Sequence, residues 1–421
     1  MRPWLGDAAP VDGEPLQSEN TSGSCGKRNP DGRGQFTSAV QSAPWTLARS
    51  GSAWHRACVR SAGLAHPSGT GLVLFKYPLA YLRAGTICMQ DDLFRDGLLQ
   101  SSSSFSKVLP APAGQEWRAL ARRLPAQLRF GVSTWSYPGW EGLVWEGEYD
   151  SSTLSKHGLR AYQQHPLLRT VCVDRTFWRP LTASQYAAYA GQVDDDFRFV
   201  VKCPASITDA QVRGEEGRTR EANPVFLDPA LAIEEFVQPA LEGLGAKLGV
   251  LVFQLSPLPL GWLSHSATLF EKLGRLLAAV REALPEPGAV IVAVEVRDPE
   301  LLGRALVDTL KAHGATFCLG LHGKMPPIEE QLPVLRALWP GPLVCRWNLN
   351  RIFGAYGYAE AQKKHDPFNA LLSEDLPTRT VLARTIRGIT GAGQPAYVTV
   401  SNDAEGCAPL SIQKLAQAIG G

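Results

Sequence analysis

Short apolar runs and amphipathic stretches alternate along the second half of the chain. The runs are rich in β-branched residues and about four to eight residues long, which is typical of strands covered on both faces. They are Leu128–Thr134, Thr170–Asp174, Phe197–Lys202, Leu248–Leu255, Ala289–Val296, Thr316–Leu321, Leu343–Trp347 and Ala396–Ser401. The pattern therefore predicts eight buried strands in sequence order.

Helical patterns with start and stop signals lie between these runs. Asp228-Pro229 predicts a helix start, because aspartate caps a first turn in which proline loses no hydrogen bond. Apolar stripes follow at residues 233–244 and 269–280. Asp298-Pro299 predicts another start, and His313-Gly314 predicts a stop.

Strict alternation of strand and helix predicts an α/β fold, a (β/α)₈ TIM barrel over residues 128–421. An open, doubly wound sheet is the alternative. That fold usually has a glycine-rich turn after its first strand, whereas this chain has Ser133-Thr134-Trp135-Ser136 there. The pattern favours the closed barrel.

The first 115 residues have a different composition. They are rich in Gly, Ser and Pro and show no sustained period, so they predict a largely disordered, low-complexity extension. Met89 is one of only three methionines and opens a more ordinary stretch, which makes it an alternative start of translation.

Composition narrows the class of protein. Hydrophobic residues make up 44% of the chain and charged residues 19%, and the formal net charge is +2. These values fit a globular protein and favour neither nucleic acid nor a membrane as an obligatory partner. The eight cysteines contain no C-x-x-C pair, and no signal-like segment opens the chain, so we expect reduced thiols and a cytoplasmic protein.

Polar or aromatic residues stand at the end of every predicted strand. In a TIM barrel the ligand site lies at these carboxyl ends. The candidates are Trp135, Tyr137, Asp174, Lys202, Gln254, Glu295, Arg297, His322, Arg346, Asn348, Asn402 and Asp403. We expect them to surround one mouth and to bind a small-molecule ligand.

Glu295 is the sharpest candidate, since it follows five apolar residues of a buried strand. A buried carboxylate needs a cation beside it, and Lys202, Arg297 and Arg346 are available. Two interpretations stay open. Glu295 is either a general base or acid whose pKa a neighbour tunes, or one half of a structural ion pair.

The remaining candidates leave further alternatives open. Lys202 is either an anion-binding cation or a Schiff-base lysine, and His322 is either a general acid or base or an incidental loop residue. No cofactor is predicted. A divalent metal held by Asp174, His322 and Glu295 is not excluded, although their spacing is not diagnostic.

Two long segments are expected to overhang the mouth. Asp209–Phe226 is charged and aperiodic, which favours a solvated, mobile loop. Asn348–Tyr358 contains Phe353, Tyr356 and Tyr358 together with glycine, which suits a lid over a bound molecule.

Six ordered motifs carry a family resemblance. They are FGVSTWSYPGW (130–140), RTFWRP (175–180), FRFVVKCPASIT (197–208), VFQLSP (252–257), VAVEVRDP (292–299) and NDAEGCAP (402–409). Together they resemble the YecE-like family, domain of unknown function 72, over about residues 130–419. The resemblance implies a (β/α)₈ barrel and gives no reaction.

The chain departs from the pattern of that family twice. Cys172-Val173-Asp174 stands where many members have Glu-Ile-Asn, and Arg346-Trp347-Asn348-Leu349 stands where many have Arg-x-His-Gly. A carboxylate and an imidazole are therefore replaced, so a mechanism built on that pair is not expected here.

The leading hypothesis is an enzyme that acts on a small polar or anionic, phosphorylated or sugar-like ligand. Lys202 and Arg346 hold the anion, Glu295 exchanges a proton, and Gln254 and Asn402 position the ligand. Hydrolysis or isomerisation is suggested by analogy with the fold alone. The alternative is a non-catalytic module that binds or senses a metabolite at the same mouth. The oligomeric state stays open.

Overall fold

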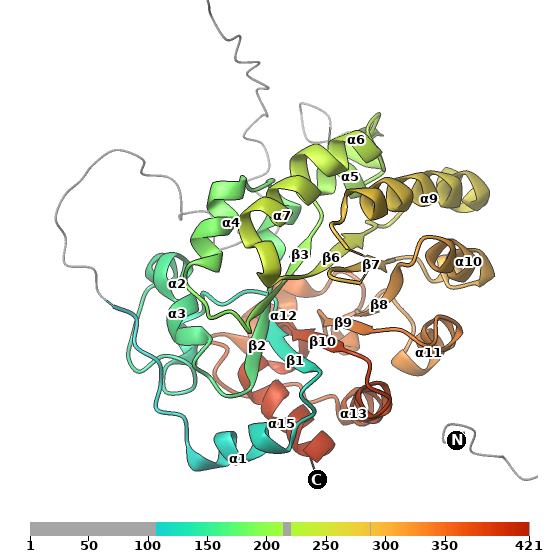
Figure 1. Cartoon of the computed structure of the whole chain (residues 1–421). Helices are drawn as coiled ribbons and strands as arrows, with labels where there is room; N and C mark the ends of the chain where they lie inside the picture. Colours follow the sequence, from blue (N-terminus) through green and yellow to red (C-terminus); the bar gives the residue numbers. More distant parts are fainter. Residues whose placement is uncertain (1–106, 214–219, 287, 421) are drawn as a thin grey trace, which may run out of the picture. The chain divides into compact units, whose positions relative to one another are not determined.

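The computed structural model describes residues 107–213, 220–286 and 288–420. In this part of the chain eight parallel strands close into a barrel in the order β1-β10-β9-β8-β7-β6-β3-β2 (Figure 1). They are β1 (Leu128–Val132), β2 (Leu168–Val173), β3 (Arg198–Lys202), β6 (Leu248–Gln254), β7 (Ile291–Glu295), β8 (Thr316–Leu321), β9 (Leu343–Trp347) and β10 (Ala396–Val400). The predicted TIM barrel is confirmed, and so is each of its strands. The expected extension lies outside the described residues over positions 1–106, Met89 included.

Helices surround the barrel (Figure 1). The α-helices are α1 (Gln115–Arg123), α2 (Ser151–His157), α3 (Leu159–Tyr162), α4 (Ala183–Ala190), α5 (Ala205–Thr208), α6 (Pro229–Ala232), α7 (Gln238–Leu244), α8 (Leu260–Ser264), α9 (Ser266–Ala283), α10 (Arg304–Ala312), α11 (Ile328–Ala337), α12 (Tyr358–His365), α13 (Leu376–Gly391), α14 (Asn402–Glu405) and α15 (Ala408–Gly420). Shorter helical turns are η2 (Pro138–Trp140), η3 (Asp174–Phe177), η4 (Ile233–Val237), η5 (Gly245–Lys247), η6 (Pro299–Leu301) and η7 (Arg351–Phe353). No helix in residues 107–420, as far as they are described, is long and apolar enough to cross a membrane.

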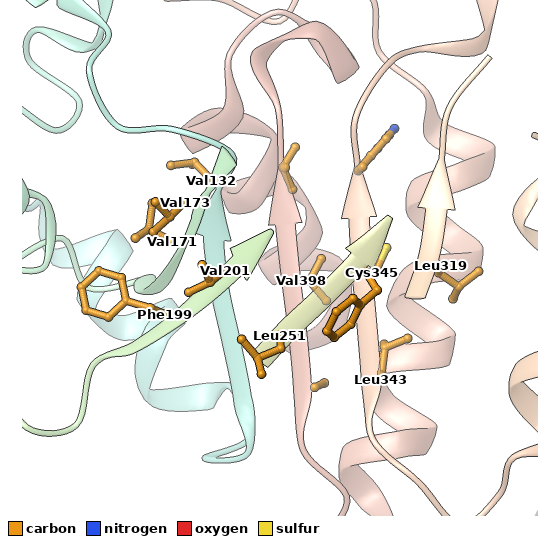
Figure 2. Close-up of a cluster of buried hydrophobic side chains, with 14 of the residues drawn as sticks. Val132, Val171, Val173, Phe199, Val201, Leu251, Leu319, Leu343, Cys345 and Val398 are labelled. Carbon is orange, nitrogen blue, oxygen red and sulfur yellow. The ribbon is translucent and has the colours of Figure 1, made fainter. Parts of the chain in front are cut away.

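Alternate strand positions feed two separate cores, because successive side chains of a strand point to opposite faces. One set packs between strands and helices, and Figure 2 shows part of it: Val132, Val171, Val173, Phe199, Val201, Leu251, Leu319, Leu343, Cys345 and Val398. The other set contains strand residues only: Cys172, Val200, Val250, Val252, Ile291, Ala293, Cys318, Val344 and Tyr397. This smaller cluster fills the inside of the barrel, and we call it the inner core. The cluster between strands and helices is the outer core.

The first predicted helix start is confirmed, and the second is confirmed only for the short turn η6, which begins at Pro299 after Asp298. The Asp228 carboxylate accepts a hydrogen bond from the Leu231 amide and so caps α6. Asp298 makes no capping bond. Its carboxylate instead accepts from the Leu258 amide at 2.8 Å and pairs with Lys324 Nζ at 2.5 Å, and α10 begins only at Arg304. Two stronger partners on neighbouring loops outcompete the cap.

Residues ahead of β1 contact the barrel. Val108 is buried, and the Ala111 amide donates to the Val144 carbonyl at 2.9 Å. Helix α1 lies beside α15 (Figure 1), where Gln417 Nε2 donates to Glu116 Oε1 at 3.2 Å. The segment from Val108 onward is thus attached to the folded part of the chain.

Candidate functional site

The strand pattern places a layer of polar side chains directly above the inner core. Asp174, Lys202, Gln254, Glu295 and Arg346 each follow an inner-core residue by two positions, on the same face of the strand. We call seven residues at this end of the barrel the mouth network: Asp174, Lys202, Gln254, Glu295, Arg297, Arg346 and Asn348. All but Asp174 are buried.

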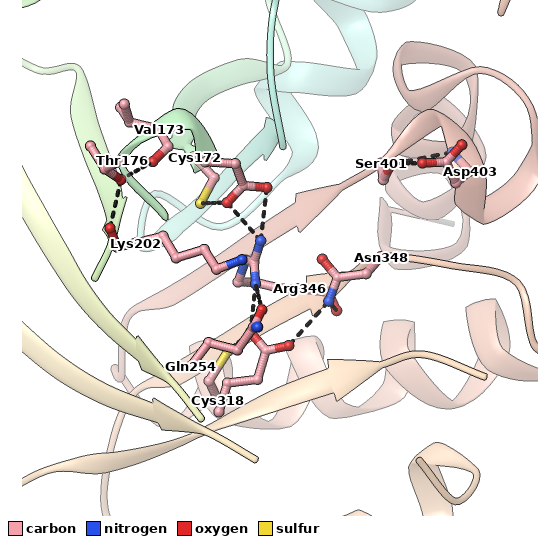
Figure 3. A network of polar contacts seen from close by, with 12 residues as sticks. Cys172, Val173, Thr176, Lys202, Gln254, Cys318, Arg346, Asn348, Ser401 and Asp403 are labelled. Atoms are coloured by element: carbon pink, nitrogen blue, oxygen red, sulfur yellow. Dashed lines mark hydrogen bonds and ion pairs between the residues drawn. The ribbon is translucent and has the colours of Figure 1, made fainter. Parts of the chain in front are cut away.

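Arg346 lies at the centre of the mouth network (Figure 3). Its Nη1 donates to Glu295 Oε2 at 2.6 Å and to Gln254 Oε1 at 3.2 Å. Its Nη2 donates to both Asp174 oxygens, at 2.7 and 2.8 Å. One guanidinium therefore joins β9 to β7, β6 and the end of β2, and hydrogen bonds between oppositely charged groups are stronger than neutral ones.

Glu295 is fully buried, and three side chains donate to it. Arg297 Nη2 lies 2.6 Å from Oε1, Arg346 Nη1 lies 2.6 Å from Oε2, and Asn348 Nδ2 lies 3.2 Å from Oε1. Burial by itself raises the pKa of this carboxyl, but Arg297, Arg346 and Lys202 outweigh burial and lower the pKa to about 2. Glu295 is consequently ionised throughout the physiological range.

Lys202 differs from the other charged members of the mouth network. Its side chain points toward Arg346 (Figure 3), and its Nζ lies 3.6 Å from the centre of the Phe177 ring. Among the described residues, no hydrogen bond or ion pair is made by this ammonium group. Burial, and next the charge of Arg346, lower its pKa to about 8, although Asp174 and Glu295 oppose that shift.

His322 lies at the end of β8 as a neutral imidazole. Its Nδ1 accepts from the Lys324 amide at 3.1 Å, and its ring lies 5.4 Å from the Tyr358 ring. Burial, followed by the charge of Arg297, lowers its pKa to about 3. His322 therefore stays uncharged at neutral pH, and its Nδ1 already has a local donor.

Asn402 and Asp403 begin α14, directly after β10. Asn402 Oδ1 accepts from the Ala408 amide at 2.8 Å, which ties α14 to α15. Asp403 Oδ2 lies 3.1 Å from Ser401 Oγ. Burial raises the pKa of the Asp403 carboxyl to about 7 against the opposing effect of Ser401. Asp403 is thus the predicted site residue whose carboxyl gains and loses a proton near neutral pH.

The structure gives Trp135 and Tyr137 positions in aromatic packing around η2 and α2. Trp135 is fully buried in the outer core, and its Nε1 donates to the Leu154 carbonyl at 3.1 Å. Tyr137 is half-buried, with ring centres 5.1 Å from Trp140 and 5.2 Å from Phe368. The polar atom of Trp135 is therefore committed to the fold, and its role as a ligand contact stays a prediction.

Phe177, which was not predicted, and Tyr358, which was predicted only as part of the lid, also contact the site. Phe177 lies under the Lys202 ammonium, and Tyr358 packs on His322. Burial is the main cause that raises the pKa of Tyr358. The charge of Arg297 lowers this pKa, and the charge of Asp403 raises it. The motif RTFWRP contains Phe177, but nothing in the sequence indicates that its ring faces a lysine on the next strand.

No metal centre is formed in the described residues, where no three His, Cys, Asp or Glu side chains gather as ligands. Arg346 bridges Asp174 and Glu295, so these two carboxylates share an arginine. His322 uses Nδ1 on Lys324. The three candidate ligands named from the sequence do not converge on one point.

The aromatic segment after β9 is folded more tightly than a simple lid. Asn350 is buried, and its Nδ2 donates to the carbonyls of Ser373 and Ala404 at 2.7 and 3.0 Å. Of its aromatic residues, Tyr358 contacts His322, Phe353 packs on His365 and Tyr356 is exposed. The lid interpretation now depends on Tyr358.

The charged segment after β3 is partly ordered, contrary to expectation. Strands β4 (Gln211–Arg213) and β5 (Arg220–Ala222) pair in antiparallel fashion. The Asn223 side chain then donates to the carbonyls of Ser206 and Asp209, both at 2.7 Å. These bonds hold the base of the hairpin, an arrangement that charge pattern alone does not reveal; residues 214–219 lie outside the described part.

A groove of about 590 Å³ lies away from the mouth network, between α11, η7 and the start of α13. Four carboxylates line it, from Glu329, Glu330, Glu374 and Asp375, with Arg351 as the cation among its lining residues. Such a groove is unsuited to an anion. The mouth network is therefore the better candidate for the expected anionic ligand.

Comparison with known proteins places the chain in a family. A family model described as "Protein of unknown function DUF72" matches residues 129–421. The chain belongs to the DUF72 family. The match begins at β1, so the DUF72 region coincides with the barrel. No curated protein matches the chain.

Two solved DUF72 structures are similar to this chain. A DUF72 protein of Enterococcus faecalis V583 is 14% identical, with a TM-score of 0.46, and the match covers 69% of this chain and 95% of that one. A DUF72 protein of Thermotoga maritima MSB8 is 21% identical, with a TM-score of 0.46, and the match covers 69% of this chain and 98% of that one.

The two departures from the expected DUF72 pattern both lie in or beside the mouth network. Cys172 stands where a carboxylate was expected, and its thiol donates a hydrogen bond to Asp174 Oδ1 at 3.1 Å. Asp174 follows it by two residues and supplies the carboxylate that Arg346 binds. Asn348, where an imidazole was expected, donates to Glu295. Carboxylate charge is thereby retained at the end of β2, whereas the imidazole has no replacement at position 348.

Proposed function

We propose that the barrel mouth binds a small anionic ligand and that the protein is an enzyme acting on it. The observation that carries this proposal is the unpartnered ammonium of Lys202. Three cations, Lys202, Arg297 and Arg346, face two carboxylates in the mouth network, which leaves one net positive charge. A buried surplus charge is costly, and an anionic ligand offsets that cost.

Unused donors support the same proposal. The Nε–H groups of Arg297 and Arg346 are buried and have no acceptor within the described residues. The mouth network is therefore richer in donors than in acceptors. A phosphate, carboxylate or sulfate group supplies acceptors and negative charge together.

The arrangement suggests a division of roles. Lys202 binds the anion, while Glu295 and Asp174 hold Arg346 in place. Because Glu295 has a pKa of about 2 and three donors, we propose that it positions the arginines and does not transfer protons. Asp403, whose carboxyl has a pKa of about 7, is the better proton donor or acceptor. Isomerisation or hydrolysis of a phosphorylated or sugar-like compound is the reaction that we propose.

A non-catalytic binding module is the second candidate. The bonds around Glu295 favour it, because both carboxylate oxygens are already engaged by the protein. In that case the mouth binds a metabolite, and the ligand leaves unchanged.

The binding proposal is tested by the melting temperature in the presence of small anions at constant ionic strength. Phosphate, pyruvate, glycerol 3-phosphate and glucose 6-phosphate are compared with chloride, on wild type, Lys202→Met and the exposed control Lys311→Met. We expect at least one anion to raise the melting temperature of wild type and of the control, and not of Lys202→Met. No effect in wild type, or an equal effect in Lys202→Met, contradicts the proposal.

Turnover separates the two candidates. The anion that stabilises the protein most is incubated with it and followed by NMR. Chemical change that depends on Asp403 supports an enzyme. An unchanged ligand at saturation supports the binding module.

A further inference from the structure

The position of Lys202 is suited to covalent chemistry. Thr176 Oγ1 lies 2.5 Å from the Lys202 carbonyl and 2.6 Å from the Val173 carbonyl, so β3 is fixed to η3 at this residue. The side chain then extends over Phe177 toward the centre of the mouth (Figure 3). The backbone at Lys202 is thus fixed, the ammonium group lies over the Phe177 ring, and no carboxylate or carbonyl of the described residues accepts a hydrogen bond from it.

From this geometry we propose that Lys202 forms an imine with a small carbonyl compound that carries an anionic group, an α-oxo acid above all. The inference deepens the proposed function and rests on it, because it assumes that the mouth accepts an anion. It assigns Lys202 as a catalytic nucleophile and narrows the substrate class to carbonyl compounds.

The surroundings of Lys202 favour the neutral amine that such a reaction needs. Burial disfavours the charged form most, and the charges of Arg346 and Arg297 add to this effect. Asp174 and Glu295 attract the charged form, but they are already paired with those arginines. With a pKa of about 8, a sizeable fraction of the side chain is neutral near pH 7.5. An exposed lysine, with a pKa of about 10.4, is almost entirely charged there.

The step balances without any further reactant. The Lys202 nitrogen bonds to the carbonyl carbon, the carbon–oxygen double bond opens, and the oxygen leaves as water with two hydrogens from the amine. The imine takes back from solvent the proton that the ammonium gave up before the attack, which restores one positive charge at the position of the former ammonium. The surplus charge of the mouth network therefore persists after the reaction, and it still pairs with the anionic group.

An α-oxo acid carries both the anionic group and the electrophilic carbonyl that the inference requires, within three atoms of each other. Its carboxylate is attached directly to the carbonyl carbon, so the anion and the electrophile arrive at the same place. Lys202 is 8% exposed, which limits access to a small compound. A protonated imine beside the carboxylate also acidifies the neighbouring C–H bond, which is the chemistry of an isomerisation.

Reductive trapping tests the inference. Wild type is incubated with pyruvate, glyoxylate or dihydroxyacetone phosphate and with cyanoborohydride, and the product is digested and mapped by mass spectrometry. The variants are Lys202→Arg, which keeps the charge but forms no imine, Lys202→Met, and the exposed control Lys311→Arg. We expect one adduct, on the peptide that contains Lys202, in wild type and in Lys311→Arg. Acetone, which is neutral, is expected to react at least tenfold more slowly than pyruvate.

The pH dependence gives a second measurement. Labelling of Lys202 should level off above about pH 8, whereas labelling of surface lysines should keep rising toward pH 10. Labelling confined to surface lysines, or equal labelling by acetone and pyruvate, overturns the inference. If anions still stabilise wild type and Lys202→Arg, the proposed function survives that failure. If they stabilise neither, both proposals fail.

Discussion

Glu295 shows how single residues make a buried charge stable at the barrel mouth. Its carboxylate lies above the inner core, where two arginines bind one oxygen each. Gly320 on the next strand leaves room for it, because a Cβ there would lie 3.0 Å from Oε1 and 3.1 Å from Cγ. The ion pairs and the missing side chain together give Glu295 a fully enclosed site. Its removal should therefore affect folding as well as any ligand.

Glu295→Gln should lower the free energy of unfolding by about 3–5 kcal/mol, since it leaves Arg297 and Arg346 buried with too little negative charge. The measurement is urea unfolding at pH 7. Glu271→Gln is the matched control, because Glu271 is exposed and lies 3.9 Å from Arg275, one turn along α9. The control should change by less than about 0.5 kcal/mol. A Glu295→Gln curve equal to that of the control would show that Glu295 does not hold the mouth together.

Asp403 makes a separate prediction about pH. Its carboxyl has a pKa of about 7 in the folded chain and an ordinary value of 3.8, so the folded state holds the proton over a range in which the unfolded state has lost it. Its ionisation therefore destabilises the fold as pH rises from about 4 to 7. Asp403→Asn should be more stable than wild type at pH 8, by on the order of 2 kcal/mol, and equal to it below pH 4. A difference that does not change with pH would contradict the burial of this carboxyl.

At the scale of the elements, the strands were predictable because covered strands need continuous apolar runs. The side of the strand on which each candidate residue lies could also be predicted, because Ala293, Glu295 and Arg297 alternate with outward-facing residues. The ion-pair partners of these residues could be predicted only in part. Arg297 and Arg346 were both named as cations for Glu295, but Asp174 lies 172 residues from Arg346 in the sequence. Their contact depends on how the barrel closes.

Turns and loops were less predictable, because their contacts are tertiary. Trp135 stays a predicted ligand contact, but the hydrogen bond from its indole to the Leu154 carbonyl could not be predicted from its place after β1. Gly323 lies against the aromatic segment, where a Cβ would approach the Gly354 carbonyl to 2.0 Å. Such close contacts order the segment, and no sequence pattern indicates them.

The N-terminal boundary of the barrel can be tested at the same scale. A chain beginning at Lys107 keeps the contacts of Val108 and Ala111, and one beginning at Glu116 loses them. We expect the first to melt within about 2 °C of the full chain and the second to melt at least 4 °C lower, since about 1 kcal/mol shifts a domain of this size by a few degrees. Differential scanning calorimetry of the three chains measures this. Equal melting of the two shortened chains would show that residues 107–115 do not contribute to stability.

In the part of the chain that the structure describes, several buried charges are matched by ion pairs away from the mouth network. Arg379 pairs with Glu405 at 2.6 Å, and Asp298 pairs with Lys324. Lys202 differs from these residues, because its ammonium group lies over the Phe177 ring and makes no ion pair with any described residue. The chain thus carries a cost at the barrel mouth, and such costs are typical of sites built for a ligand.

The most direct test of this account is the free energy of unfolding of Lys202→Met relative to wild type, measured in urea at pH 7 without phosphate or carboxylate buffers. The pKa of Lys202 is about 8 in the folded chain, whereas its ordinary value is 10.5. Below pH 8 the folded state therefore bears the full cost of the charge, and that cost disappears as pH rises from 8 to 10.5. We predict that Lys202→Met is more stable than wild type at pH 7, by about 1–3 kcal/mol, and that the difference shrinks toward pH 10.5. A variant less stable than wild type by 1 kcal/mol or more, within the range that buried structural residues show, would mean that Lys202 serves the fold and would contradict the account.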